Sequence, residues 1–166
     1  MEITIEMVKA LRDRTGAGIM ATRNALEECG GDMEKAAKVL AEQGLAAVAK
    51  RAGRGTAEGV VGSYVHTGNR IGALVEVNCE TDFVARTPEF AELAHDLAMQ
   101  VAAMAPEHVS NDDVPEGAEV SAEKVLLEQA FIKDPSKTVR DLVAEVAARV
   151  RENIQVRRFS RIALGE

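Results

Sequence analysis

The chain has 166 residues, of which 46% are hydrophobic, so it can form one domain with a core or one domain with a small satellite. Its net charge of −7 argues against direct nucleic-acid binding, because a duplex binder needs a basic face. Two cysteines without metal-ligand spacing argue against a zinc site, and the lack of a signal sequence or a long apolar run predicts a cytoplasmic protein without a membrane partner.

The first 53 residues predict a bundle of three short helices. Thr4 is a suitable N-cap for the first helix, and the two glycines within residues 15–18 end it. Asp32 is a suitable N-cap for the third helix, which we expect to end at Gly44. Residues 45–57 start helix-like, then become rich in Gly and Arg, and read as a linker. Such a bundle has a thin core, so we expect it to dock on the rest of the chain or on a partner.

From residue 54 onward the pattern predicts an α+β core. Residues 58–66 and 70–79 are strand-like and are separated by a short turn, so we expect them to form a hairpin. Residues 154–164 are a further strand-like stretch, which we expect to pair with this hairpin. The sequence thus predicts a helical domain over residues 1–53 and an α+β core over residues 54–166, with an antiparallel sheet flanked by helices.

Two long helices complete the predicted core. Thr87 caps the first, with Pro88 at its first position, and an apolar stripe follows up to Pro106. Residues 106–120 are an acidic loop. The second helix begins at Thr138, which forms a capping-box pattern with Asp141.

Chemistry that would support covalent catalysis is sparse. The three histidines stand in unrelated segments, and no glycine-rich phosphate loop follows a strand. Cys79 at the end of a strand fits a small core residue better than a nucleophile. We therefore expect no enzyme activity, no cofactor and no bound metal. A nucleophilic Cys79 assisted by a nearby carboxylate is the alternative.

The stretch NCETDFVAR at residues 78–86 places an aromatic residue in a connection between a strand and a helix. Aromatic residues are scarce, with four Phe, one Tyr and no Trp. Phe83 could close the end of the sheet as a buried residue. It could instead be an exposed aromatic that enters an apolar pocket of a partner, with the negative charge of Asp82 beside it.

Several motifs together resemble translation elongation factor Ts. They are the sequences TGAG at residues 15–18, IGALVEVNC at 71–79, NCETDFVAR at 78–86, and ENI at 152–154. The resemblance runs nearly from end to end. The segment between Val109 and Phe131 is short, and a helical hairpin that compact members of this family usually carry is absent there.

The resemblance implies a ubiquitin-associated-like N-terminal bundle and a guanine-nucleotide exchange factor that binds elongation factor Tu in its GDP form. Thr81, Asp82, Phe83 and Val84 match the family segment associated with dislocation of Mg²⁺ from the GTPase. Phe83 would insert between helices of the partner. The compact type tends to form homodimers, so a homodimer is also implied.

The resemblance further implies that the N-terminal bundle contacts the same GTPase, and we select Arg12, Ile19 and Met20 for this contact. Their alternative roles are a surface arginine and two apolar residues of the bundle core. A different class of function also stays open, in which the bundle is a non-catalytic helical adaptor and the core is only a dimer scaffold.

Overall fold

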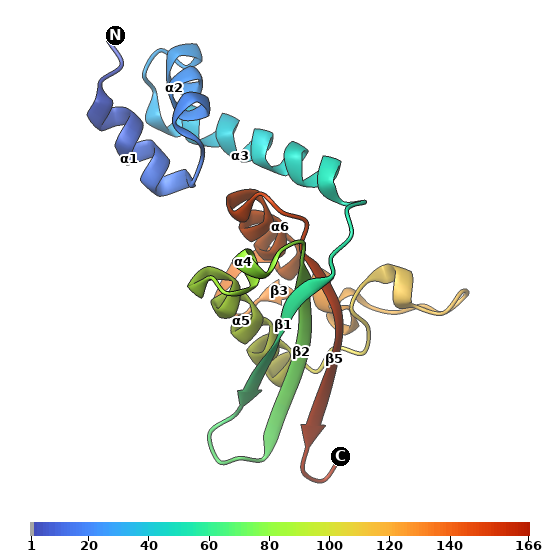
Figure 1. Ribbon diagram of the computed structural model, residues 1–166. Helices are drawn as coiled ribbons and strands as arrows, with labels where there is room; N and C mark the ends of the chain where they lie inside the picture. Colours follow the sequence, from blue (N-terminus) through green and yellow to red (C-terminus); the bar gives the residue numbers. More distant parts are fainter. Residues whose placement is uncertain (1) are drawn as a thin grey trace.

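The computed structural model describes residues 2–166 and shows an α+β protein in which three helices precede a mixed core (Figure 1). The fold class predicted from the sequence is confirmed. The three N-terminal helices are α1 (Ile5–Thr15), α2 (Ile19–Glu28) and α3 (Met33–Arg51). The main elements of the core are β1 (Glu58–Val65), β2 (Ile71–Cys79), α4 (Asp82–Ala85), α5 (Pro88–Met104), α6 (Val139–Val150) and β5 (Gln155–Ala163).

The boundaries of the N-terminal helices follow from local capping. The Thr4 side chain accepts a hydrogen bond from the Met7 N–H, and Gly16 ends α1 in the left-handed conformation at φ 68°. Asp32 caps α3 by accepting hydrogen bonds from the first free N–H groups of that helix. The helices enclose a small core of their own, formed by Leu11, Ala25, Leu26, Ala36 and Leu40.

Helix α3 passes through Gly44 and ends at Arg51, so the predicted helix end at Gly44 is wrong, and the non-helical linker is confined to residues 52–57. A Cβ on Gly44 would lie 3.2 Å from the Cβ of Ala148 on α6. The missing side chain therefore allows α3 to approach α6 closely, and this contact outweighs the cost of glycine within a helix, about 1 kcal/mol. The half-buried Val48, one turn further on, packs against the main core. The bundle thus docks on the core through the second half of α3.

The sheet has the order β1-β2-β5, and both pairs are antiparallel, as predicted for the hairpin and the C-terminal strand. One face packs against α5. At Gly62 of β1 a Cβ would lie only 2.3 Å from the carbonyl oxygen of Ala94 on α5, so only glycine fits there. The predicted inward residues of β2 are Ile71, Ala73, Val75 and Val77; Ile71 is half-buried and the other three are buried.

The opposite face of the sheet carries exposed apolar side chains. Val61 is 66% exposed, Leu74 52% and Ile162 74%, although each lies within a strand. The alternation of the strands places these residues away from α5. We call this set, Val61, Leu74 and Ile162, the outer apolar face.

Between α5 and α6 the chain forms short elements. They are three 3₁₀ turns, η1 (Asn111–Asp113), η2 (Ala122–Lys124) and η3 (Leu126–Glu128), and the two-stranded ladder of β3 (Ala130–Phe131) with β4 (Asp134–Thr138). The sequence did not predict this ladder. The buried Gln100 of α5 organises the segment, because its side chain donates to Gln129 and to the Ala130 carbonyl and accepts from the Ile132 N–H.

Candidate functional site

The connection between β2 and α5, residues 80–87, forms an exposed corner around the one-turn helix α4. Phe83 on α4 is 82% exposed, so the alternative of a buried aromatic at the end of the sheet is excluded. Ala85 is buried and Val84 is half-buried against the core, so the same turn has an inner and an outer side. The structure therefore presents a large apolar ring to solvent on a short, anchored turn.

Hydrogen bonds at both ends define the exposed corner. The Thr81 hydroxyl accepts a bond from the Val84 N–H at 3.4 Å, and the Thr87 hydroxyl accepts one from the Phe90 N–H at 3.3 Å, which starts α5. The Thr87 hydroxyl also donates to the Val84 carbonyl at 2.8 Å. The Thr87 side chain thus links the end of α4 to the start of α5.

Asp82 lies beside the exposed ring and pairs with Arg86, one turn further along, at 3.1 Å. Both side chains are exposed to solvent, so this ion pair contributes little to stability and holds the Asp82 carboxylate only weakly. Asp82 can therefore exchange Arg86 for another cation at small cost. The exposed corner combines an aromatic side chain with an available negative charge.

The exposed corner is bound to the turn between α6 and β5. The Glu152 carboxylate accepts hydrogen bonds from the Glu80 N–H and the Thr81 N–H, each at 3.0 Å, and from the Thr81 hydroxyl at 2.5 Å. In return, the Glu80 carboxylate accepts a bond from the Asn153 N–H at 2.7 Å. We call these four residues, Glu80, Thr81, Glu152 and Asn153, the polar junction.

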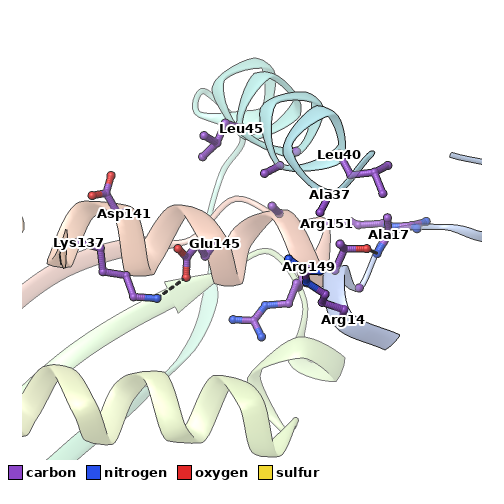
Figure 2. A pocket seen from close by; sticks show the side chains of 15 residues that line it. Arg14, Ala17, Ala37, Leu40, Leu45, Lys137, Asp141, Glu145, Arg149 and Arg151 are labelled. Atoms are coloured by element: carbon purple, nitrogen blue, oxygen red, sulfur yellow. Dashed lines mark hydrogen bonds and ion pairs between the residues drawn. The ribbon is translucent and has the colours of Figure 1, made fainter. Parts of the chain in front are cut away.

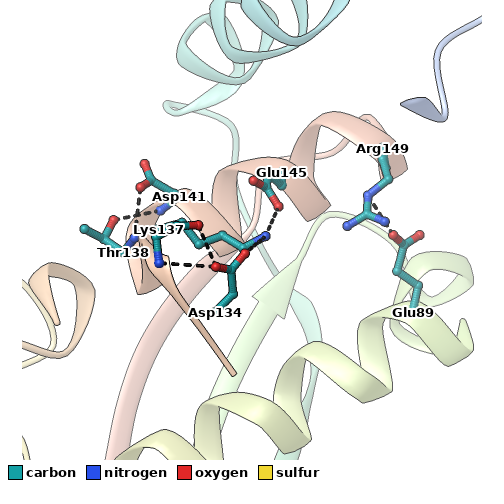
Figure 3. A network of polar contacts seen from close by, with 8 residues as sticks. Glu89, Asp134, Lys137, Thr138, Asp141, Glu145 and Arg149 are labelled. Atoms are coloured by element: carbon teal, nitrogen blue, oxygen red, sulfur yellow. Dashed lines mark hydrogen bonds and ion pairs between the residues drawn. The ribbon is translucent and has the colours of Figure 1, made fainter. Parts of the chain in front are cut away.

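The start of α5 is also fixed to α6, as Figure 3 shows. Arg149 near the end of α6 pairs with Glu89 in the first turn of α5 at 3.1 Å. At the other end of α6, Thr138 and Asp141 form the predicted capping box, and Lys137 pairs with Glu145 at 2.8 Å. Helix α6 therefore supports the element that directly follows the exposed corner.

The N-terminal candidates Arg12, Ile19 and Met20 lie on the surface. Ile19 is 58% exposed and Met20 64%, so neither belongs to the bundle core, and Arg12 on α1 is exposed as well. Ile19 and Met20 begin α2 directly after the turn at residues 15–18. The bundle thus presents two apolar side chains and one cation to solvent.

A groove of about 680 Å³ lies between the bundle and α6, beside the contact of α3 with α6 (Figure 2). Its apolar wall comes from α3, with Ala37, Leu40 and Leu45, whereas α6 contributes the charged side chains of Glu145 and Arg149. The groove is therefore lined by the bundle and by α6, and it includes no residue of the exposed corner.

Cys79 does not have the properties of a nucleophile. Its side chain is fully buried, and its Sγ–H donates to the Thr81 carbonyl at 3.2 Å. Burial, with a smaller contribution from the charge of Glu152, raises the pKa of the Cys79 thiol to about 11. The thiol therefore stays neutral at physiological pH.

Within residues 2–166, no group of three His, Cys, Asp or Glu side chains is arranged to hold a metal ion. The same residues include no helix with the length and apolar character needed to cross a membrane.

Sequence reasoning did not find the role of Glu152 and Asn153. Glu152 contacts residues that are 71 and 72 positions earlier in the chain. No local pattern in a single sequence reports such a pairing. The only available signal was the short stretch ENI at residues 152–154, which contributed to the family resemblance.

Comparison with known proteins gives a consistent result. A family model described as "Elongation factor TS" matches residues 33–121. Curated proteins named "Elongation factor Ts" are 50% identical in Carboxydothermus hydrogenoformans, covering 99% of this chain and 90% of the relative, and 47% identical in Coprothermobacter proteolyticus, covering 100% of both. The relative in Thermotoga petrophila is 46% identical over 100% of this chain and 98% of its own length. The first alignment spans 195 positions, against 166 residues here, so that relative carries segments that this chain lacks.

Proposed function

This chain belongs to the elongation factor Ts family, and from that premise we propose that it is a guanine-nucleotide exchange factor for the GDP-bound form of elongation factor Tu. The observation that carries the proposal is the 82% exposure of Phe83 on an anchored turn. A soluble domain gains nothing for its own stability from an aromatic ring in water, so the ring is suited to a partner.

In this proposal Phe83 enters an apolar pocket between helices of the GTPase. Burying a Phe side chain is worth about 1.5–3 kcal/mol, and the exposed ring can gain most of this on binding. The neighbouring Asp82 brings a negative charge to the region where the partner holds Mg²⁺ and thereby disturbs the surroundings of the ion. Thr81 and Val84 set the orientation of the turn that carries both side chains.

The mechanism is a thermodynamic linkage between two ligands of the GTPase. If the factor and GDP with Mg²⁺ favour different arrangements of one site, each weakens the binding of the other by the same factor. A tenfold weakening requires about 1.4 kcal/mol of differential interaction. Insertion of one Phe supplies one or two such steps, and displacement of the ion adds to it. No covalent step is needed, so the factor requires neither a nucleophile nor a cofactor.

The N-terminal bundle adds a second contact with the same GTPase through Arg12, Ile19 and Met20. Their exposure supports this assignment, because two neighbouring apolar side chains at a helix start lose water when a partner covers them. This contact contributes affinity, whereas the exposed corner drives release of the nucleotide.

We also propose that the protein forms a homodimer through the outer apolar face, Val61, Leu74 and Ile162. No helix covers this face within the described residues 2–166, and its central residue Leu74 lies on the middle strand β2. Two copies related by a two-fold axis would each cover the apolar residues of the other. Light scattering tests this, with Leu74→Asp as the variant: a dimer that becomes monomeric in the variant supports the proposal, and a wild-type monomer refutes it.

The exchange function is tested with elongation factor Tu loaded with a fluorescent GDP analogue. Addition of the wild-type chain in the presence of excess unlabelled GDP is expected to accelerate loss of the fluorescent nucleotide in a concentration-dependent, saturable manner. The helical-adaptor alternative predicts binding without acceleration. A release rate equal to that of elongation factor Tu alone would refute the proposed function.

A further inference from the structure

We propose that Glu152 is a positioning residue for nucleotide exchange. It acts by holding the one-turn helix α4 (Asp82–Ala85), which we call the Phe83 turn, in the orientation required for insertion of the ring. The proposal rests on the exchange function proposed above and extends it to a residue outside the exposed corner. The polar junction carries the argument, because it joins the Phe83 turn to a distant part of the chain.

Helix α4 cannot maintain its own conformation. It has four residues, and an isolated helix of this length is unstable. The conformational entropy lost in forming the first turn exceeds the free energy gained from its hydrogen bonds. Its local support is limited to the 3.4 Å cap from the Val84 N–H to the Thr81 hydroxyl, the 2.8 Å bond from the Thr87 hydroxyl to the Val84 carbonyl, and the solvent-exposed ion pair of Asp82 with Arg86. Ala85 alone is buried among its four residues. The orientation of the turn must therefore be set by contacts from elsewhere.

The Glu152 carboxylate supplies such contacts at the base of the turn. One of its oxygens accepts both the Glu80 and the Thr81 N–H, and the other accepts the Thr81 hydroxyl. Hydrogen bonds to a charged acceptor are stronger than those between neutral groups. The bond to the hydroxyl also fixes the Thr81 rotamer that caps α4. One side chain thus determines the backbone direction and the cap of the segment that carries Phe83.

The rest of the polar junction fixes Glu152 in turn. The adjacent Asn153 donates its N–H to the Glu80 carboxylate at 2.7 Å. Its side-chain amide donates to the carbonyls of Ala52 and Arg54 at 3.2 and 2.8 Å, directly after the end of α3. The turn before β5, the exposed corner and the exit of α3 therefore meet at one point, which makes the base of the Phe83 turn rigid.

A rigid turn matters because only the correctly oriented fraction of the protein can insert the ring. If the competent orientation is populated only part of the time, the effective strength of the interaction falls by that fraction. Loss of Glu152 leaves Phe83 chemically intact but lets the turn sample other orientations. Release of GDP from the complex should then slow, even though the ring, the fold and the N-terminal contact are still present.

The test compares Glu152→Ala with Glu152→Gln in the fluorescent-GDP assay. The amide of Glu152→Gln keeps an oxygen for the two N–H groups and can donate to the Thr81 hydroxyl, so all three contacts survive in that variant. We expect the plateau release rate at saturating factor to fall about tenfold for Glu152→Ala and to stay within about twofold of wild type for Glu152→Gln. Glu107→Ala is the matched control, because it also removes an exposed, paired carboxylate. Glu107 pairs with Lys124 and follows the C-terminal end of α5, whereas the exposed corner precedes the N-terminal end of that helix.

Two further measurements separate positioning from general damage. Hydrogen–deuterium exchange of the peptide covering residues 78–86 should accelerate in Glu152→Ala, while hydrogen–deuterium exchange in α5 stays close to wild type. Adding Glu152→Ala to Phe83→Ala should lower the release rate no further than Phe83→Ala alone, because both changes remove the same insertion.

The outcomes are distinct for the two proposals. A normal plateau rate in Glu152→Ala, or an equal loss from Glu152→Ala with and without Phe83, overturns the positioning role while leaving the exchange function in place. The positioning role is also overturned if Glu152→Gln restores wild-type hydrogen–deuterium exchange of residues 78–86 but does not restore the GDP release rate. A wild-type chain that does not accelerate release at all refutes the exchange function itself.

Discussion

Substitution of Phe83 by Ala is the most direct perturbation of the proposed mechanism. The ring is 82% exposed in the free protein, so its removal creates no cavity and costs little stability. We expect the free energy of unfolding to change by less than about 0.5 kcal/mol. The folded variant therefore reports on the partner interaction alone.

The size of the functional effect follows from the surface that the ring can bury. Full burial of a Phe side chain is worth about 1.5–3 kcal/mol. Since 82% of the residue is still exposed before binding, about 1.2–2.5 kcal/mol of this gain is available for the complex. At about 1.4 kcal/mol per factor of ten, stimulated GDP release should fall roughly sevenfold to sixtyfold.

The assay measures release of fluorescent GDP from elongation factor Tu at a series of factor concentrations. Leu164→Ala is the matched control, because Leu164 is 60% exposed and directly follows β5, at the end of that strand away from the exposed corner and the N-terminal bundle. Its release rate should match wild type. Unchanged release by Phe83→Ala, with a folded protein and an active wild type, would refute the insertion of this ring.

Four further changes test other parts of the structure. Asp82→Ala should reduce stimulated release about threefold, less than loss of Phe83, because it removes one exposed charge; an equally large loss would reverse the assigned roles. Ile19→Ala should raise the half-saturating concentration about fivefold in the same assay without changing the plateau rate, and a lower plateau would contradict a contact that contributes affinity only. Gly62→Ala should lower the free energy of unfolding in urea by about 1–3 kcal/mol, because the new methyl group would meet the Ala94 carbonyl oxygen at 2.3 Å; wild-type stability would show that α5 can move away. Cys79→Ser should retain stimulated release, since the pKa of about 11 keeps the native thiol neutral, and an inactive but folded variant would revive the nucleophile hypothesis.

Local signals predicted much of the fold. The capping box at Thr138 and Asp141, the Thr87 cap with Pro88, and the alternation in β2 each lie within a few residues, and the structure confirms all of them. Interactions of this kind are encoded in neighbouring side chains, so a single sequence reveals them.

The errors arose where distant contacts override local preference. Gly44 reads as a helix end, but close packing against Ala148 keeps it inside α3. The β3–β4 ladder was missed because β4 contains Pro135 and short polar residues, which disfavour strands, and because its pairing with only two residues of β3 gives no periodic pattern.

The candidate site divided in the same way. The sequence indicated Phe83 and Asp82 by type and by their unusual place in a connection, and the structure adds their exposure. Glu152 was invisible because its partners lie more than seventy positions away, although it makes three hydrogen bonds to the base of the turn. Side chains that act on a partner can stand out in a sequence, whereas side chains that support them are found only in three dimensions.

Because α3 is continuous through Gly44, a small change of angle at its contact with α6 moves the whole N-terminal bundle. The segment from Gly44 back to Met33 is about 17 Å long at 1.5 Å per residue, so a tilt of about 10° at the contact with Ala148 would carry the far end through about 3 Å. One inserted residue before Gly44 would swing the bundle about the helix axis by about 100°. The length of this single helix therefore sets the spacing between Ile19 and Phe83, and a change in its residue count would alter the distance and the rotation between the two contacts.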